Sequence, residues 1–262
     1  MSSSRGSALY IYLVSIVAAT SGLLFGFDIA VINGALIFLR QQFALTEFQT
    51  EVAASSLLLG CVAGASIAGW LSDRFGRRRI LILSALLFGL SSLGAALPRN
   101  LAEFVVARFI GGVAIGVASV LAPLYIAEVS PPRIRGRLVS LNQMAITTGI
   151  LLAYLVNWGL STVGPSGWRW MFATAAVPSA AFFVALFFVP ESPRWLTEFG
   201  RRAEALAILT RVSGEQQALR ECAEIETSIA EERGELSELL APGLRTALII
   251  AVDIIQLGSL IV

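Results

Sequence analysis

Long stretches without a charged side chain fill most of the first 190 residues. Runs free of Asp, Glu and Arg cover 6–27, 52–72, 80–98, 109–127, 138–168 and 170–190. Because a helix needs about 20 apolar residues to cross a bilayer, each run predicts a transmembrane helix. We expect the first helix to extend past Asp28 toward Leu39 and the fourth to begin near Phe104.

The arginines between these runs predict the orientation in the membrane. The loop after the second run carries Arg74, Arg77, Arg78 and Arg79, and the loop after the fourth carries Arg133, Arg135 and Arg137. The loops after the first, third and fifth runs carry one arginine each, Arg40, Arg99 and Arg169. Arginine-rich loops stay in the cytoplasm. We therefore expect a multi-pass protein of the cell membrane with a cytoplasmic N-terminus.

Residues 191–240 differ from the apolar region, since they hold 11 of the 15 Glu and six Arg. Apolar positions at helical spacing predict two or three short amphipathic helices on the cytoplasmic side, with a plain charged linker as the alternative. The sequence thus divides into a bundle over 1–190, an intracellular helical domain over 191–243 and the incomplete start of a seventh membrane helix over 244–262.

Composition narrows the possible functions. Of the 262 residues 56% are hydrophobic and 14% charged, all 19 basic residues are Arg, and His is absent. Lysine Schiff bases, phosphate-loop lysines and histidine bases or metal ligands are thereby excluded. No spacing typical of a nucleophile and its base or of a metal site is present. We expect no enzyme, no cofactor, no metal and no nucleic-acid partner, but a lipid bilayer around the chain.

Two charges fall inside predicted spans, Asp28 in the first and Arg108 in the fourth. An ionisable group in a bilayer is costly and marks a functional site by default. Protonation of Asp28 could release Arg108 and shift the protein between two states. A purely structural ion pair, or an Arg108 that extends to the outer surface near Glu103, remains equally compatible with the charge positions.

Acids, glycines, prolines and arginines cluster at three predicted cytoplasmic helix ends, in 69–78, 128–137 and 190–196. The glycines of the first cluster predict a close helix contact and a tight turn. Asp73 could hold a neighbouring helix through an arginine pair. Ion pairs that break and reform at these ends would form a latch for one conformation.

These clusters, together with 108–112 and 123–128, resemble the sugar porter family of the major facilitator superfamily. The resemblance implies an all-α membrane fold, namely the N-terminal six-helix bundle with its 3+3 inverted repeat, followed by cytoplasmic helices and a truncated seventh helix. It also implies transport of a sugar or polyol, by proton symport.

The resemblance also implies roles for individual residues. Gln143 matches a sugar-contacting glutamine, with Asn142 beside it, and Phe25 matches an aromatic residue near the sugar. Asp28 and Arg108 match the pair of proton-coupled members. The cytoplasmic charge latch of the outward-facing state is matched by Gly69, Asp73, Arg74, Gly76, Arg77, Arg78, Glu128, Arg135, Arg137, Glu191 and Arg194. From the residues alone, Asn142 and Gln143 could equally be hydrogen-bonding contacts between helices.

The sequence departs from the family after Ile255, where a single Gln256 does not reproduce the glutamine-rich motif of the seventh helix. Sugar sites of this fold lie between two six-helix halves, so we expect a second half to be missing from this chain. Three alternatives stay open: a truncated or frameshifted half without transport activity, a major facilitator of another substrate class such as a drug antiporter, and a disfavoured homodimer of halves.

Overall fold

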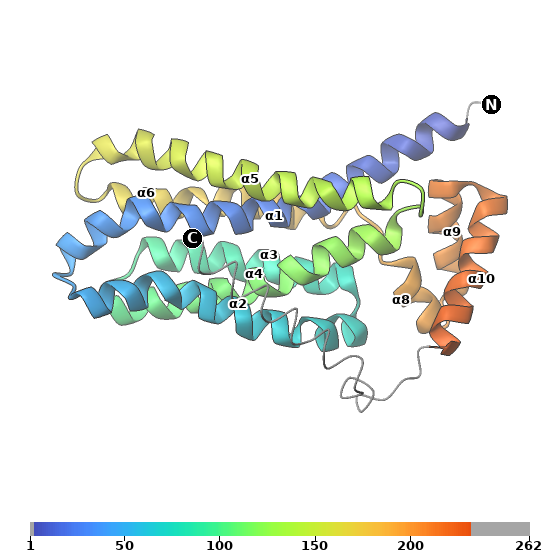
Figure 1. The fold of residues 1–262 in the computed structure, drawn as a ribbon, viewed down its shortest axis with the longest axis horizontal. Helices are drawn as coiled ribbons and strands as arrows, with labels where there is room; N and C mark the ends of the chain where they lie inside the picture. The colour runs from blue at the N-terminus through green and yellow to red at the C-terminus, as the bar shows by residue number, and fades with distance from the viewer. Residues whose placement is uncertain (1–2, 232–262) are drawn as a thin grey trace, which may run out of the picture. The chain divides into compact units, whose positions relative to one another are not determined.

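A computed structural model describes residues 3–231, and within them five helices are long and apolar enough to cross a membrane. These are α1 (Ser3–Gln42), α2 (Glu47–Phe75), α3 (Arg77–Ala96), α4 (Leu101–Val129) and α5 (Arg135–Leu160). They lie side by side as a bundle (Figure 1). The first five predicted spans are therefore confirmed as helices, with α1 extending past Leu39 as expected.

The sixth predicted span, 170–190, is not one continuous helix. After a short 3-10 turn, η1 (Ser161–Val163), the chain forms α6 (Gly167–Thr174) and α7 (Ala176–Ala185). Pro178 explains the break, because proline has no N–H to donate to the carbonyl of Thr174 and its ring crowds that carbonyl. The sixth predicted span is thus present as two consecutive helices that meet at Ala175.

Three shorter helices follow the bundle: α8 (Pro193–Glu198), α9 (Arg202–Ser213) and α10 (Glu215–Glu231). Ser192 caps α8, since its hydroxyl accepts a hydrogen bond from the Trp195 N–H at 3.3 Å and Pro193 occupies the first helical position. The described residues up to Cys222 form one compact unit, which contains the whole membrane bundle. The predicted seventh helix, 244–262, lies outside the described residues.

Helices α1 and α5 pack closely along their length, as do α2 and α4. Exchange of the first three membrane helices with the second three maps one of these pairs onto the other, as a 3+3 repeat requires. Glycines line both contacts: a Cβ at Gly26 would lie 2.0 Å from the Ile146 carbonyl oxygen, and one at Gly64 would lie 2.2 Å from that of Val113. Small residues let membrane helices approach this closely. We call these two contacts the glycine seams.

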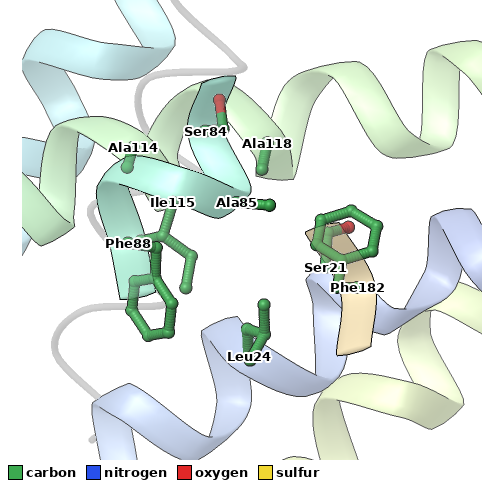
Figure 2. A pocket seen from close by; sticks show the side chains of 9 residues that line it. All are labelled: Ser21, Leu24, Ser84, Ala85, Phe88, Ala114, Ile115, Ala118 and Phe182. Atoms are coloured by element: carbon green, nitrogen blue, oxygen red, sulfur yellow. The ribbon is translucent and has the colours of Figure 1, made fainter. Parts of the chain in front are cut away.

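The bundle interior between α1, α3, α4 and α7 is tightly packed. Figure 2 shows the one small void described there, with Leu24, Phe88, Ile115 and Phe182 around it. Its volume is about 10 Å³, roughly that of a single water-sized probe. This part of the bundle therefore has room for at most about one water molecule.

Hydrogen bonds from Arg169 on α6 join this helix to the C-terminal end of α3. Arg169 donates to the carbonyl oxygens of Ala96 at 2.9 Å and Pro98 at 3.1 Å, where α3 ends. Its guanidinium also lies over the Trp168 ring, 4.6 Å from the centroid. A cation at a helix C-terminus satisfies unpaired carbonyls and complements the helix dipole. Arg169 thereby connects the third and sixth membrane segments.

The glycine seams leave no room for a side chain between the paired helices, so adding a single methyl group at a seam tests this contact. Gly26→Ala should lower the free energy of unfolding in detergent by about 1–3 kcal/mol, because its Cβ overlaps the α5 backbone. Gly69→Ala is the matched control, since a Cβ at Gly69, also inside a helix, meets nothing within 4 Å. The control should be neutral or slightly stabilising. Equal effects of the two substitutions would contradict the close-contact interpretation.

Candidate functional site

Asp28 on α1 and Arg108 on α4 form an ion pair inside the bundle. Nη1 of Arg108 donates to Oδ1 of Asp28, and Nη2 lies 3.4 Å from the Asp28 carbonyl oxygen. Their side chains are only 4% and 2% exposed, respectively. The alternative in which Arg108 extends to the outer surface is therefore wrong. The pair joins the first helices of the two three-helix repeats.

The surroundings of the pair leave part of its hydrogen-bonding capacity unused. The guanidinium of Arg108 lies 5.2 Å from the centroid of the Phe172 ring on α6. Oδ2 of Asp28 and Nε of Arg108 are buried, and neither has a hydrogen-bond partner among the described residues. Removing one member of a buried pair leaves the other charge uncompensated, at a cost of about 3–5 kcal/mol. Protonation of Asp28 would therefore change the energy of the α1–α4 contact substantially.

At the predicted cytoplasmic helix ends, a second buried arginine binds a carboxylate with two nitrogens. Nε and Nη2 of Arg77, at the start of α3, each lie 3.1 Å from an oxygen of Glu128 near the end of α4. Glu128 also accepts a hydrogen bond from the Ser192 hydroxyl before α8. Nη2 donates a charge-assisted hydrogen bond to Oε1, and the contact between Nε and Oε2 is an ion pair without hydrogen-bond geometry. Arg77 and Glu128 thus join α3, α4 and α8.

Asp73 lies at the edge of this cluster, near the end of α2. Its Oδ1 is 3.1 Å from Nη2 of Arg77, and its side chain is 62% exposed. Asp73 therefore reaches an arginine of the next helix, as expected, but water screens the pair and leaves it weak. The buried partner of Arg77 is Glu128 instead.

Glu191 supports the turn between α2 and α3. Its Oε1 accepts from the backbone N–H of Arg78 at 3.0 Å and from that of Ser192 at 2.9 Å. Gly76 has a φ of 95°, and a Cβ there would lie 2.6 Å from Oε2 of Glu191. Both the left-handed backbone and the approach of the carboxylate require glycine. The predicted tight turn is confirmed at Gly76.

Arg78 uses its side chain to fasten the end of α7. Its Nε donates to the Leu186 carbonyl at 2.8 Å and its Nη2 to the Phe187 carbonyl at 2.7 Å. These carbonyls follow the last helical residue, Ala185, so the arginine caps the helix C-terminus. Arg78 and Arg169 thus perform the same task at opposite ends of the third and sixth segments.

Three other predicted latch residues, Arg74, Arg135 and Arg137, make their described contacts outside this network. Arg74 stacks over Phe75 and Arg137 over Tyr12, each with 5.8 Å to the ring centroid. Arg135 donates to the Ser130 carbonyl at 3.5 Å. Gly69 is exposed with open space around it, so the close helix contact expected there is wrong for the described residues. Arg194, on α8, lies within electrostatic reach of Glu128 and so belongs to the cluster.

Several contacts of the cluster were not predicted from the sequence. Tyr125 donates its hydroxyl to the Pro190 carbonyl at 2.7 Å, and Trp195 donates its indole N–H to the Asp73 carbonyl at 2.9 Å. Ser192 both caps α8 and binds Glu128. Only Ser192 carried a sequence signal, because serine followed by proline is typical of a helix start.

The three predicted sugar contacts differ in their exposure in the described structure. Gln143 is exposed on α5 and Phe25 is half-buried on α1. Asn142 is buried in the α1–α5 seam, where its Oδ1 would lie 2.8 Å from a Cβ on Gly22. That Oδ1 has no hydrogen-bond partner among the described residues. Their roles toward sugar stay predictions.

Comparison with known proteins decides the family. The profile of the family described as "Sugar (and other) transporter" matches residues 14–260. The chain belongs to this family. It is 46% identical over 254 residues to the arabinose-proton symporter of Bacillus subtilis, covering 93% of this chain and 54% of that protein. It is 39% identical to the D-xylose-proton symporter of Escherichia coli, and the match covers 89% of this chain and 54% of that protein.

The fold agrees with a solved member of the major facilitator superfamily. The structure of the proton:xylose symporter XylE bound to 6-bromo-6-deoxy-D-glucose matches with a TM-score of 0.86 and 38% identity. The match covers 90% of this chain and 57% of XylE. The chain spans about half the length of the curated relatives it matches. It has the fold of an N-terminal major facilitator half, within a family of multi-pass membrane transporters.

Glu128 is buried beside Arg77 whereas Asp73 is exposed, and this difference in burial can be tested by the stability of variants. Glu128→Ala should lower the free energy of unfolding in detergent by about 3–5 kcal/mol, because it strands a buried guanidinium. Asp73→Ala removes the exposed acid beside the same arginine and should cost less than about 1 kcal/mol. Glu128→Gln, which keeps a hydrogen-bonding oxygen, should fall between them. A larger loss for Asp73→Ala than for Glu128→Ala would refute the assignment.

Proposed function

We propose that this chain supplies the N-terminal half of a proton-coupled symporter for a sugar or polyol. The buried Asp28–Arg108 pair carries the proposal, because it is an ionisable pair between two membrane helices with an unused carboxylate oxygen. Two relatives, the arabinose-proton and the D-xylose-proton symporter, support a sugar as the substrate and the proton as the coupling ion.

In this scheme, ionised Asp28 holds α4 to α1 through Arg108. A proton taken up by Asp28 neutralises the carboxylate and weakens that hold, so the balance between two conformations shifts. The Arg77–Glu128–Ser192 contacts act as the cytoplasmic latch. These contacts have to break before the transporter can open toward the cytoplasm. The arginine distribution supports a cytoplasmic N-terminus, and hence an outer location for the Asp28 half of α1.

For the sugar we propose Gln143, Phe25 and Asn142 as contacts from this half. Amide groups both donate and accept hydrogen bonds, which suits a ligand with many hydroxyls. The scheme uses only side-chain protonation and helix movement. We accordingly propose that the protein is no enzyme, needs no cofactor, and has the bilayer, protons and a sugar as its partners, with no nucleic acid among them.

Proton-driven accumulation tests the coupling role of Asp28. The assay uses proteoliposomes with the transporter that contains this chain. A difference of one pH unit across the membrane corresponds to about 1.4 kcal/mol per proton. One-to-one symport should therefore accumulate labelled pentose up to about tenfold. Asp28→Asn should abolish accumulation, with a final ratio near one, but retain sugar exchange at equal pH.

Glu47→Gln serves as the control for loss of a charge, because Glu47 is exposed and pairs only weakly with Arg40 at 3.7 Å. It should accumulate pentose like the unmodified protein. Undiminished accumulation by Asp28→Asn would overturn the assignment of Asp28.

A further inference from the structure

Two hollows lie against the Asp28–Arg108 pair, and they differ in size. The first lies toward α3 and α6 and is lined by Ser91, Ser92, Ala95, Gly111 and Phe172 together with the pair itself. It has no room for a water-sized probe. A proton therefore has no hydrated route to Asp28 from this side.

The second hollow lies between α1 and α2 and has a volume of about 410 Å³. Its lining includes Ile29 and Asn33 of α1, Ser55 and Leu58 of α2, and Arg108 of α4. Arg108 is buried at 2% side-chain exposure, whereas Asn33 and Ser55 are exposed. The hollow is thus wide enough for several water molecules. It reaches Arg108, which binds Asp28, whereas Asp28 itself does not line it.

Glu51, one turn inside α2, is the one acid that lines this hollow. Its side chain is exposed and makes no hydrogen bond or ion pair within residues 3–231. The neighbouring acid, Glu47, pairs with Arg40 and does not line the hollow. An unpaired carboxylate at a hydrated entrance can bind a proton from bulk water and release it inward.

We propose that the hollow between α1 and α2 is the route by which protons reach Asp28 from the outer side, with Glu51 as the group that collects them. This inference rests on the proposed function. The step is a proton transfer alone: the Glu51 carboxyl gives its proton to water in the hollow, and water beside Arg108 passes one to the Asp28 carboxylate when the contact with Arg108 loosens. Glu51 then regains a proton from bulk water.

The charged and titratable groups around this route are few. Arg108 on α4 faces Asp28, and the Cys61 thiol on α2 is within electrostatic reach of both. At the entrance, Arg40 and Glu47 neutralise each other. Glu51 is therefore the group whose removal alters proton supply while leaving the Asp28–Arg108 contact intact.

A matched pair of substitutions tests Glu51 in the proteoliposome assay. Glu51→Gln should slow proton-driven uptake by about tenfold or more and shift its dependence on external pH toward acid, while exchange at equal pH stays unchanged. Glu51→Asp should restore most of the rate, and Glu47→Gln should behave like the unmodified protein. Equal uptake by Glu51→Gln and Glu47→Gln would overturn the inference, as would parallel loss of uptake and exchange in Glu51→Gln.

These outcomes separate the inference from the function on which it rests. If the unmodified protein shows no proton-driven uptake, the proposed function fails. If it shows uptake that Glu51→Gln leaves unaltered, only the role of Glu51 fails.

Hydration of the hollow can be tested without transport, on this chain in a bilayer. Leu58 lines the hollow and Leu59 does not, although both are exposed, at 52% and 63%. In a Cys61→Ser, Cys222→Ser background, Leu58→Cys should react at least tenfold faster than Leu59→Cys with a charged, membrane-impermeant thiol reagent. Equal rates would show that the hollow holds no more water than the lipid-facing surface, and would overturn the proposed route.

Discussion

A bilayer interior offers a charged side chain neither water nor counter-ions, so each buried charge must find its partner on another helix. Two arginines meet this requirement in the described bundle, Arg108 through Asp28 and Arg77 through Glu128. Both pairs join α4 to another helix, one within the membrane spans and one at the helix ends that carry the arginine clusters. The position of α4 relative to α1 and α3 is therefore fixed by charge as well as by packing.

The glycine seams and the terminal arginines explain how the rest of the bundle is held. Backbones of α1 and α5, and of α2 and α4, touch where a methyl group would not fit. Arg78 and Arg169 fasten opposite ends of the third and sixth segments through carbonyl oxygens. Each half of the repeat thus uses the same two devices. Among the described residues, the pair at Asp28 stands out because it combines a carboxylate oxygen without a partner in a membrane span with a wide hollow beside Arg108.

The sequence was sufficient for the spans and the tight turn at Gly76, and it singled out Asp28 and Arg108 without deciding that they pair. Each of these leaves a strong local signal, namely a long uncharged run, a charge inside it, or a glycine among charges. The break at Ala175 was missed because one proline near the start of an apolar run does not reveal which carbonyl it disrupts. The burial of Asn142, the exposure of Asp73 and the open space at Gly69 could not be foreseen, since apolar residues surround a membrane helix on every face and leave no periodicity to orient it.

Coupling in this scheme requires that Asp28 gains and loses a proton while Arg108 stays charged. Infrared difference spectroscopy of the reconstituted transporter, recorded between neutral and acidic pH with and without sugar, tests this requirement most directly. We predict a protonated-carboxyl band that appears on acidification, shifts in its pH dependence when sugar binds, and is missing from Asp28→Asn. An Asp28 carboxylate that stays ionised throughout the pH range in which transport operates would contradict the scheme.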